Sequence, residues 1–129
     1  MPHFQIDYSA NLDGVVDMVV LCEAIRARAA KIETFPLAGI RVHATRVNHY
    51  AIADGNPDHG FIDLSVRLRA GREEAVKRDA LRAVFATMTD FLTPVMRTRS
   101  IALSAEMRDI DPALSEKTGT IRDHLETPT

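Results

Sequence analysis

Residues 61–72 read FIDLSVRLRAGR, and this stretch decides the fold. Ile62, Leu64, Val66 and Leu68 alternate with polar side chains, which is the period of a half-buried strand. Beyond Gly71 the apolar residues recur at helical spacing as far as Val95, and residues 100–108 alternate again. The stretch therefore starts a strand, helix and strand unit that we place at residues 59–110.

The residues upstream repeat the same plan. Residues 3–8 alternate as a strand, and the apolar residues from Val15 to Ile32 follow one helical face. We expect Asn11 to cap this helix. A second strand is predicted from Ile40, with a bulge near residues 46–47 and a continuation through residues 50–52. The first unit thus spans residues 1–52, and residues 53–60 form a turn-rich loop.

Two tandem βαβ units predict an α+β fold with a four-stranded sheet and two helices on one face. The whole chain, residues 1–129, is expected to form a single domain, with a tail at residues 111–129 that packs on the body or on a neighbouring copy. We expect Ala, Ile and Val on the uncovered sheet face to favour oligomerisation, because large apolar patches are seldom left in water.

Composition excludes several classes of function. A net charge of −2 gives no overall attraction to nucleic acid or to an anionic membrane. Arg67 and Arg69 alternate on one strand and are interpreted as a solvated face, and the five histidines have no tight metal-ligand spacing. The single cysteine, Cys22, is interpreted as a small core residue. Without a signal peptide or a bilayer-length apolar run, the sequence predicts a cytoplasmic protein.

The first four residues, MPHF, hold the candidate catalytic group. If Met1 is removed, Pro2 carries a free secondary amine, whereas within a chain its nitrogen is an amide without basicity. Such an amine is a general base once its pKa is lowered towards neutrality, which apolar burial and neighbouring cations both favour. His3 is a candidate neighbour of that base. The alternative is a proline that only starts an edge strand.

Several short stretches together resemble the 5-carboxymethyl-2-hydroxymuconate isomerase family of the tautomerase superfamily. They are MPHF at residues 1–4, FPLAGIR at residues 35–41, ADG at residues 53–55, AGR at residues 70–72 and ALSAE at residues 102–106. The similarity continues through residues 112–114 to Lys117. The sequence departs from the family pattern after Arg41, where residues 42–46 are its own.

The resemblance implies the tautomerase fold, a homotrimer and a proton shift that needs no metal or organic cofactor. The implied substrate is 5-carboxymethyl-2-hydroxymuconate, an intermediate of homoprotocatechuate degradation that carries three carboxylates. Pro2 is implied as the catalytic base, and Arg41 and Arg72 as the substrate-binding cations. Arginine suits that role because its planar fork binds a carboxylate through two hydrogen bonds.

Two other readings of the sequence stay open. A tautomerase for another α-keto or muconate substrate would have the same proline and a similar set of cations. A catalytically silent trimer would serve as a binding or signalling module, as in the macrophage migration inhibitory factor branch of the superfamily. Taken without the resemblance, Arg41 is simply an exposed strand residue.

Overall fold

The computed structural model describes residues 2–126. Its four strands are β1 (His3–Ser9), β2 (Arg41–Val47), β3 (Gly60–Arg69) and β4 (Ile101–Ile110), and its long helices are α1 (Met18–Ala29) and α2 (Glu74–Met96). The strands form one sheet in the order β2-β1-β3-β4. Strands β1 and β2 are parallel, β1 and β3 antiparallel, and β3 and β4 parallel. The predicted pair of βαβ units and the α+β fold class are confirmed.

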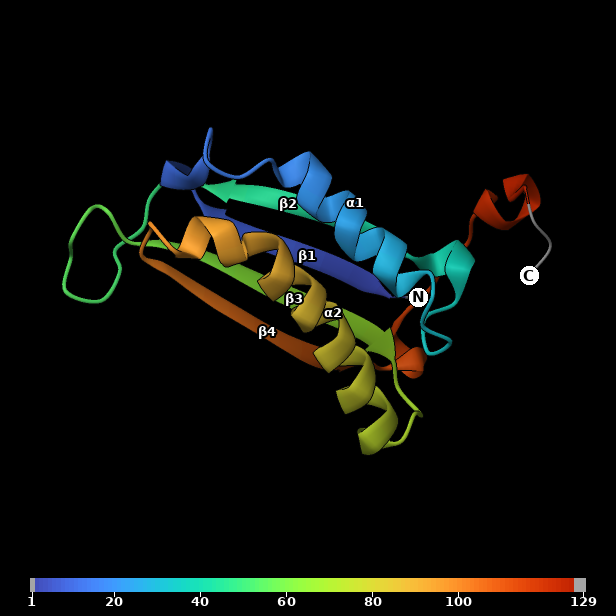
Figure 1. The fold of residues 1–129 in the computed structure, drawn as a ribbon. Helices are drawn as coiled ribbons and strands as arrows, with labels where there is room; N and C mark the ends of the chain where they lie inside the picture. Colours follow the sequence, from blue (N-terminus) through green and yellow to red (C-terminus); the bar gives the residue numbers. More distant parts are fainter. Residues whose placement is uncertain (1, 127–129) are drawn as a thin grey trace.

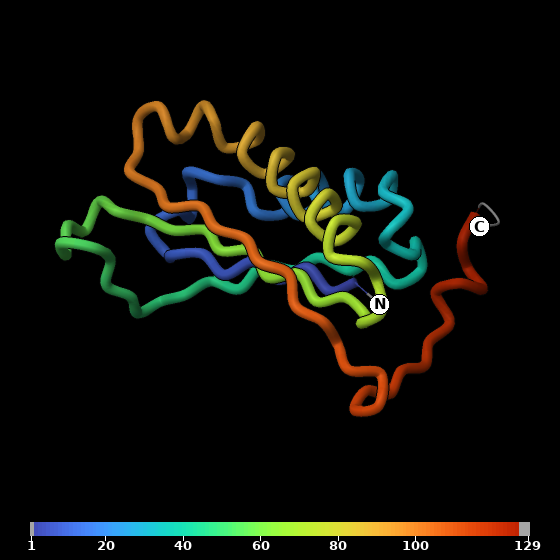
Figure 2. Tube along the Cα trace, turned by 90° about the horizontal axis from the view of Figure 1, so that it is seen from below, coloured from blue at the N-terminus to red at the C-terminus, as the bar shows by residue number. Residues whose placement is uncertain are grey.

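Both helices cover the same face of the sheet, with α1 near β2 and α2 near β4 (Figure 1). The view turned by 90° shows the helices as one layer and the sheet as a second (Figure 2). Within residues 2–126, neither of the two long helices lies on the other face of the sheet. Strand alternation explains which side chains lie between the layers. The fully buried residues include Phe4 and Ile6 of β1, Ile62 and Leu64 of β3, and Met88 of α2. Each large aliphatic side chain so buried contributes about 1.5–3 kcal/mol.

The uncovered face of the sheet is polar, and the prediction of an apolar face was wrong. In β1 the residues that point to this face are His3, Gln5 and Asp7, and in β3 they include Asp63 and Ser65. The aliphatic residues of the same strands occupy the alternate positions and face the helices. Because strand side chains have a period of 2, one choice of buried face fixes the other.

The start of α1 also differs from the prediction. Asp17, not Asn11, caps the helix, and its carboxylate accepts bonds from the amides of Val19 and Val20 at 3.1 and 3.2 Å. Asn11 lies in a 3₁₀ turn, η1 (Ala10–Leu12). Its side-chain amide instead donates to the carbonyls of Pro57 at 3.2 Å and His59 at 2.8 Å.

Strand β2 ends at Val47, and residues 50–52 are not in a strand. The register with β1 runs without a bulge from Arg41, opposite His3, to Val47, opposite Ser9. Since β1 ends at Ser9, residues beyond Val47 have no parallel neighbour there to pair with. The predicted bulge and continuation were therefore wrong.

The C-terminal tail leaves the body after β4 and contains two short 3₁₀ turns, η3 (Pro112–Leu114) and η4 (Ile121–His124). It extends away from the sheet and the helices (Figures 1 and 2). Leu114 is 85% exposed and Ile121 is 56% exposed, so the body of the chain buries neither side chain. Among residues 2–126, no helix is long and apolar enough to cross a membrane.

Candidate active site

Pro2 lies directly before β1, beside the start of β2. It is buried, and its carbonyl accepts a hydrogen bond from the Arg41 amide at 3.4 Å. Because β1 and β2 are parallel and His3 pairs with Arg41, the starts of both strands meet at one end of the sheet. The fold thus brings together two of the three residues implied by the resemblance. Met1 lies outside the described residues, so its removal stays a prediction.

The antiparallel pairing of β1 with β3 adds further cations at the same end of the sheet. His3 lies opposite Arg67, and the end of β3 therefore runs alongside the start of β1. In the parallel pair β3 and β4, Arg67 lies beside Arg108. Arg41, His3, Arg67 and Arg108 consequently form one row across the four strands on the uncovered face.

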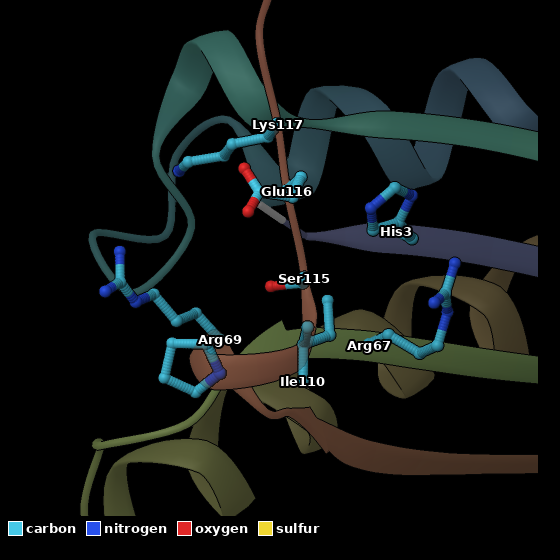
Figure 3. Close-up of a pocket in the computed structure, with 8 residues that line it drawn as sticks. His3, Arg67, Arg69, Ile110, Ser115, Glu116 and Lys117 are labelled. Carbon is cyan, nitrogen blue, oxygen red and sulfur yellow. The ribbon is translucent and has the colours of Figure 1, made fainter.

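A cavity of about 460 Å³ opens beside this row, between the end of β3 and the tail (Figure 3). Its lining is dominated by basic and polar groups. The residues are His3, Arg67, Arg69, Ile110, Pro112, Ser115, Glu116 and Lys117. Three of them are basic side chains and one is a carboxylate, so the cavity suits an anionic ligand.

A second hollow of about 650 Å³ lies between the tail and the residues at the start of β2. Arg41 lines it, together with Arg122 and the backbone of residues 38–39. Lys117 lines both hollows. Arg41 therefore faces a hollow that shares one lining residue with the cationic cavity.

Arg72 follows β3 after a tight turn and is half-buried. Gly71 in this turn has φ of +119°, a backbone conformation that residues with a Cβ rarely adopt. The Nη1 atom of Arg72 donates to the carbonyl oxygen of Arg69 at 3.1 Å. Arg72 is not among the residues that line either hollow, but this bond holds its guanidinium against a residue that does.

The electrostatic field of the row acts on His3. Partial burial is the largest cause that lowers its pKa from the ordinary value of 6.5, and the charges of Arg67 and Arg41 lower it further. His43 acts in the same direction. His3 is therefore mostly neutral at pH 7 and is able both to donate and to accept a hydrogen bond.

Sequence reasoning missed the contribution of Arg67, Arg69 and Lys117 to this cavity. The two arginines were interpreted as a solvated strand face, and they are indeed exposed, but that face borders the hollow. The antiparallel pairing of β1 and β3 was the missing step. Alternation alone predicts on which face of the sheet a residue lies, but not which strand lies beside its own.

Within residues 2–126, no group of three or more His, Cys, Asp or Glu side chains is placed to hold a metal ion.

Cys22 is half-buried on α1 and packs against the core, and burial raises the pKa of its thiol. A raised pKa disfavours the reactive thiolate.

The fold defines the broad class of protein to which this chain belongs. Two βαβ units in one sheet are the tautomerase fold, and solved structures of more distant proteins share it. The native fused 4-OT matches with a TM-score of 0.63 at 20% identity, over 84% of this chain and 87% of that one.

The narrower family follows from closer relatives. The family model for 5-carboxymethyl-2-hydroxymuconate isomerase matches residues 2–125, and the chain belongs to this family. It is 29% identical to the 5-carboxymethyl-2-hydroxymuconate Delta-isomerase of Escherichia coli, over 94% of this chain and 96% of the relative. The protein is therefore an isomerase that acts on a small molecule.

Two solved structures agree with this assignment. A crystal structure of a 5-carboxymethyl-2-hydroxymuconate delta-isomerase has a TM-score of 0.90 and 30% identity, covering 100% of this chain and 95% of that chain. A 5-carboxymethyl-2-hydroxymuconate isomerase from Deinococcus radiodurans R1 has a TM-score of 0.87 and 32% identity, covering 95% and 92%.

Proposed function

We propose that the protein shifts a proton from the 2-hydroxyl to C-5 of 5-carboxymethyl-2-hydroxymuconate, without a cofactor, in the degradation of homoprotocatechuate. The observation that carries this proposal is the position of Pro2 beside Arg41 at the cation-rich end of the sheet. The protein acts as a single-domain cytoplasmic enzyme and as a homotrimer.

After Met1 is removed, the neutral Pro2 amine accepts the proton of the 2-hydroxyl group. The product of this step is a dienolate, and the amine becomes a secondary ammonium ion. The ammonium then returns its proton to C-5, which yields the conjugated 2-oxo isomer and regenerates the neutral amine. One group carries out both transfers because it cycles between two protonation states.

Surrounding charges favour this cycle in two ways. Burial and the nearby arginine charges disfavour the protonated amine, so more of it is available as a base at neutral pH. Arg41 and Arg72 bind carboxylates of the substrate, and a guanidinium near the 2-oxygen stabilises the dienolate by preorganised electrostatics. The permanent charge of arginine keeps this stabilisation independent of pH.

The test measures the rate at which the protein turns over 5-carboxymethyl-2-hydroxymuconate, followed by ultraviolet absorbance. The protein used is one whose intact mass shows that Met1 is absent. Pro2→Ala keeps a terminal amine, so we expect kcat to fall by about tenfold to a hundredfold, less than the roughly 10²–10⁴-fold of losing a base. Pro57→Ala is the matched control, because Pro57 is exposed in the loop at the opposite end of the sheet.

Four outcomes separate the proposal from its alternatives. Rapid turnover that depends on Pro2 supports it, whereas full activity of Pro2→Ala refutes the assignment of the base. Turnover only of other α-keto or muconate substrates would point to a different tautomerase. Absence of turnover with a free Pro2 amine would favour the silent binding module.

A further inference from the structure

We infer that Arg67 binds the carboxylate of the carboxymethyl group and thereby selects this substrate over muconates that lack it. The inference rests on the proposed function, because the proposed substrate has three carboxylates and Arg41 and Arg72 account for two. A third fixed cation is needed at the same end of the sheet.

The position of Arg67 meets this need. It lies directly opposite His3 in the antiparallel register, and His3 follows Pro2 in the chain. Side chains of directly opposed residues lie on the same face of a sheet with their Cβ atoms about 4.5–5.5 Å apart. In Figure 3 the Arg67 side chain extends from β3 towards the level of His3, at the edge of the cavity.

Ion pairing distinguishes Arg67 from Arg108, the strand arginine next to it. No carboxylate of residues 2–126 forms an ion pair with its guanidinium, although its side chain is exposed beside a cavity. Its neighbour Arg108 differs, because Nη2 of Arg108 lies 2.9 Å from the Glu106 carboxylate. The guanidinium of Arg67 is thus available to a carboxylate from solution.

Arg69 is a weaker candidate for the same role. It also lines the cavity, but in Figure 3 its side chain points away from His3. Its carbonyl already fixes Arg72, so Arg69 contributes to the arrangement through its backbone. The charge nearest to the start of β1 on this strand is that of Arg67.

The first experiment compares Arg67→Gln with wild type on two substrates, 5-carboxymethyl-2-hydroxymuconate and 2-hydroxymuconate. A lost charge-assisted hydrogen bond predicts a fall in kcat/KM of about tenfold to a hundredfold for the first substrate. For the second substrate we expect a change below about threefold. Equal losses on both substrates would overturn the inference.

Arg82→Gln is the matched control. Arg82 is exposed on α2, in the helical layer, and it lines neither hollow. We expect its two kcat/KM values to stay within about twofold of wild type. A loss as large and as selective as that of Arg67→Gln would indicate a general effect of surface charge and would also overturn the inference.

A binding measurement separates failure of this inference from failure of the proposed function. Calorimetry with propane-1,2,3-tricarboxylate and with glutarate requires no turnover. Wild type should bind the tricarboxylate at least about tenfold more tightly than glutarate, and Arg67→Gln should lose most of that preference. An unchanged preference in the variant, or none in wild type, refutes the role of Arg67 whether or not the isomerase assay succeeds.

Discussion

At the scale of single residues, His3 reports the electrostatics of the site. Its folded-state pKa lies below the ordinary value of 6.5 because of burial and of the neighbouring charges of Arg67 and Arg41. Between the folded pKa and 6.5 the unfolded chain therefore binds more protons at this residue than the folded chain does. The contribution of His3 to stability is fully present above pH 6.5 and is lost as the pH falls through that window.

This loss of stability at low pH leads to a prediction for His3→Gln. The variant lacks the titrating group, so its urea midpoint should fall less than that of wild type between pH 7.5 and pH 5. In wild type, the ring-proton shift of His3 in an NMR titration should have its midpoint below 6.5. A midpoint above 6.5, or the same pH dependence in the variant, would contradict the assigned electrostatics.

The candidate site was predictable from the sequence only in part. Pro2 and Arg41 were named from their motifs, and the parallel pairing of β1 and β2 brings them together. Arg67 was interpreted as part of a solvated face and Lys117 was given no role in the site, because no local pattern distinguishes a strand arginine beside a cavity from one in open water. Their neighbours come from other strands and from the tail, and pairing in space is not encoded in any short stretch.

At the scale of elements, Ser9 links the end of β1 to the loop before β3. Ser9 is fully buried, and its hydroxyl accepts from the Phe61 amide at 2.9 Å and donates to Asn11 Oδ1 at 2.8 Å. Asn11 in turn binds the carbonyls of residues 57 and 59. A Cβ added at Gly60 would lie 3.1 Å from the Ser9 hydroxyl, so this junction is closely packed.

We expect Ser9→Ala to lower the free energy of unfolding by about 1–3 kcal/mol, since it leaves the Phe61 amide and the Asn11 side chain without their buried partner. Urea unfolding at pH 7 measures this loss. Ser65→Ala, on the uncovered face of β3, is the matched control and should change stability by less than about 0.5 kcal/mol. Equal effects of the two substitutions would show that the Ser9 network adds no stability.

The cap of α1 gives a second prediction at this scale. Asp17 accepts from two amides that would otherwise lack partners, so Asp17→Ala should cost about 0.5–2 kcal/mol. Asn11→Ala should also destabilise the protein, but by loosening the loop at residues 57–59. Hydrogen exchange distinguishes the two, because Asp17→Ala should speed exchange at the start of α1 and Asn11→Ala should not.

Helices and strands were predicted best where a local sequence pattern determines them. The alternation of residues 62–68 and the helical period after Gly71 depend on local chemistry, and both elements formed as expected. The N-cap and the end of β2 depend on tertiary neighbours. Asn11 is a good capping residue by type, yet its Oδ1 accepts from the Ser9 hydroxyl and its amide donates to the carbonyls of residues 57 and 59. Strand β2 ends where β1 ends.

At the scale of the whole molecule, the polar sheet face changes the expected basis of assembly. The sequence predicted that apolar residues on this face would join subunits, but its residues are largely charged or polar. Large exposed apolar groups instead include Leu114 and Ile121 on the tail, which projects from the body. We therefore expect the proposed homotrimer to bury these tail side chains on a neighbouring copy.

The corresponding prediction concerns mass in solution. Sedimentation equilibrium of wild type should give three times the 14.3 kDa of one chain. Leu114→Asp combined with Ile121→Asp should shift the protein to the monomer, because each aliphatic side chain buried at a contact contributes about 1.5–3 kcal/mol and each occurs in all three subunits. Val19→Asp is the control, since Val19 is 79% exposed but lies on α1. A monomeric wild type would refute the trimer, whereas a trimer that survives the tail substitutions but not Val19→Asp would place the contacts on the helical layer.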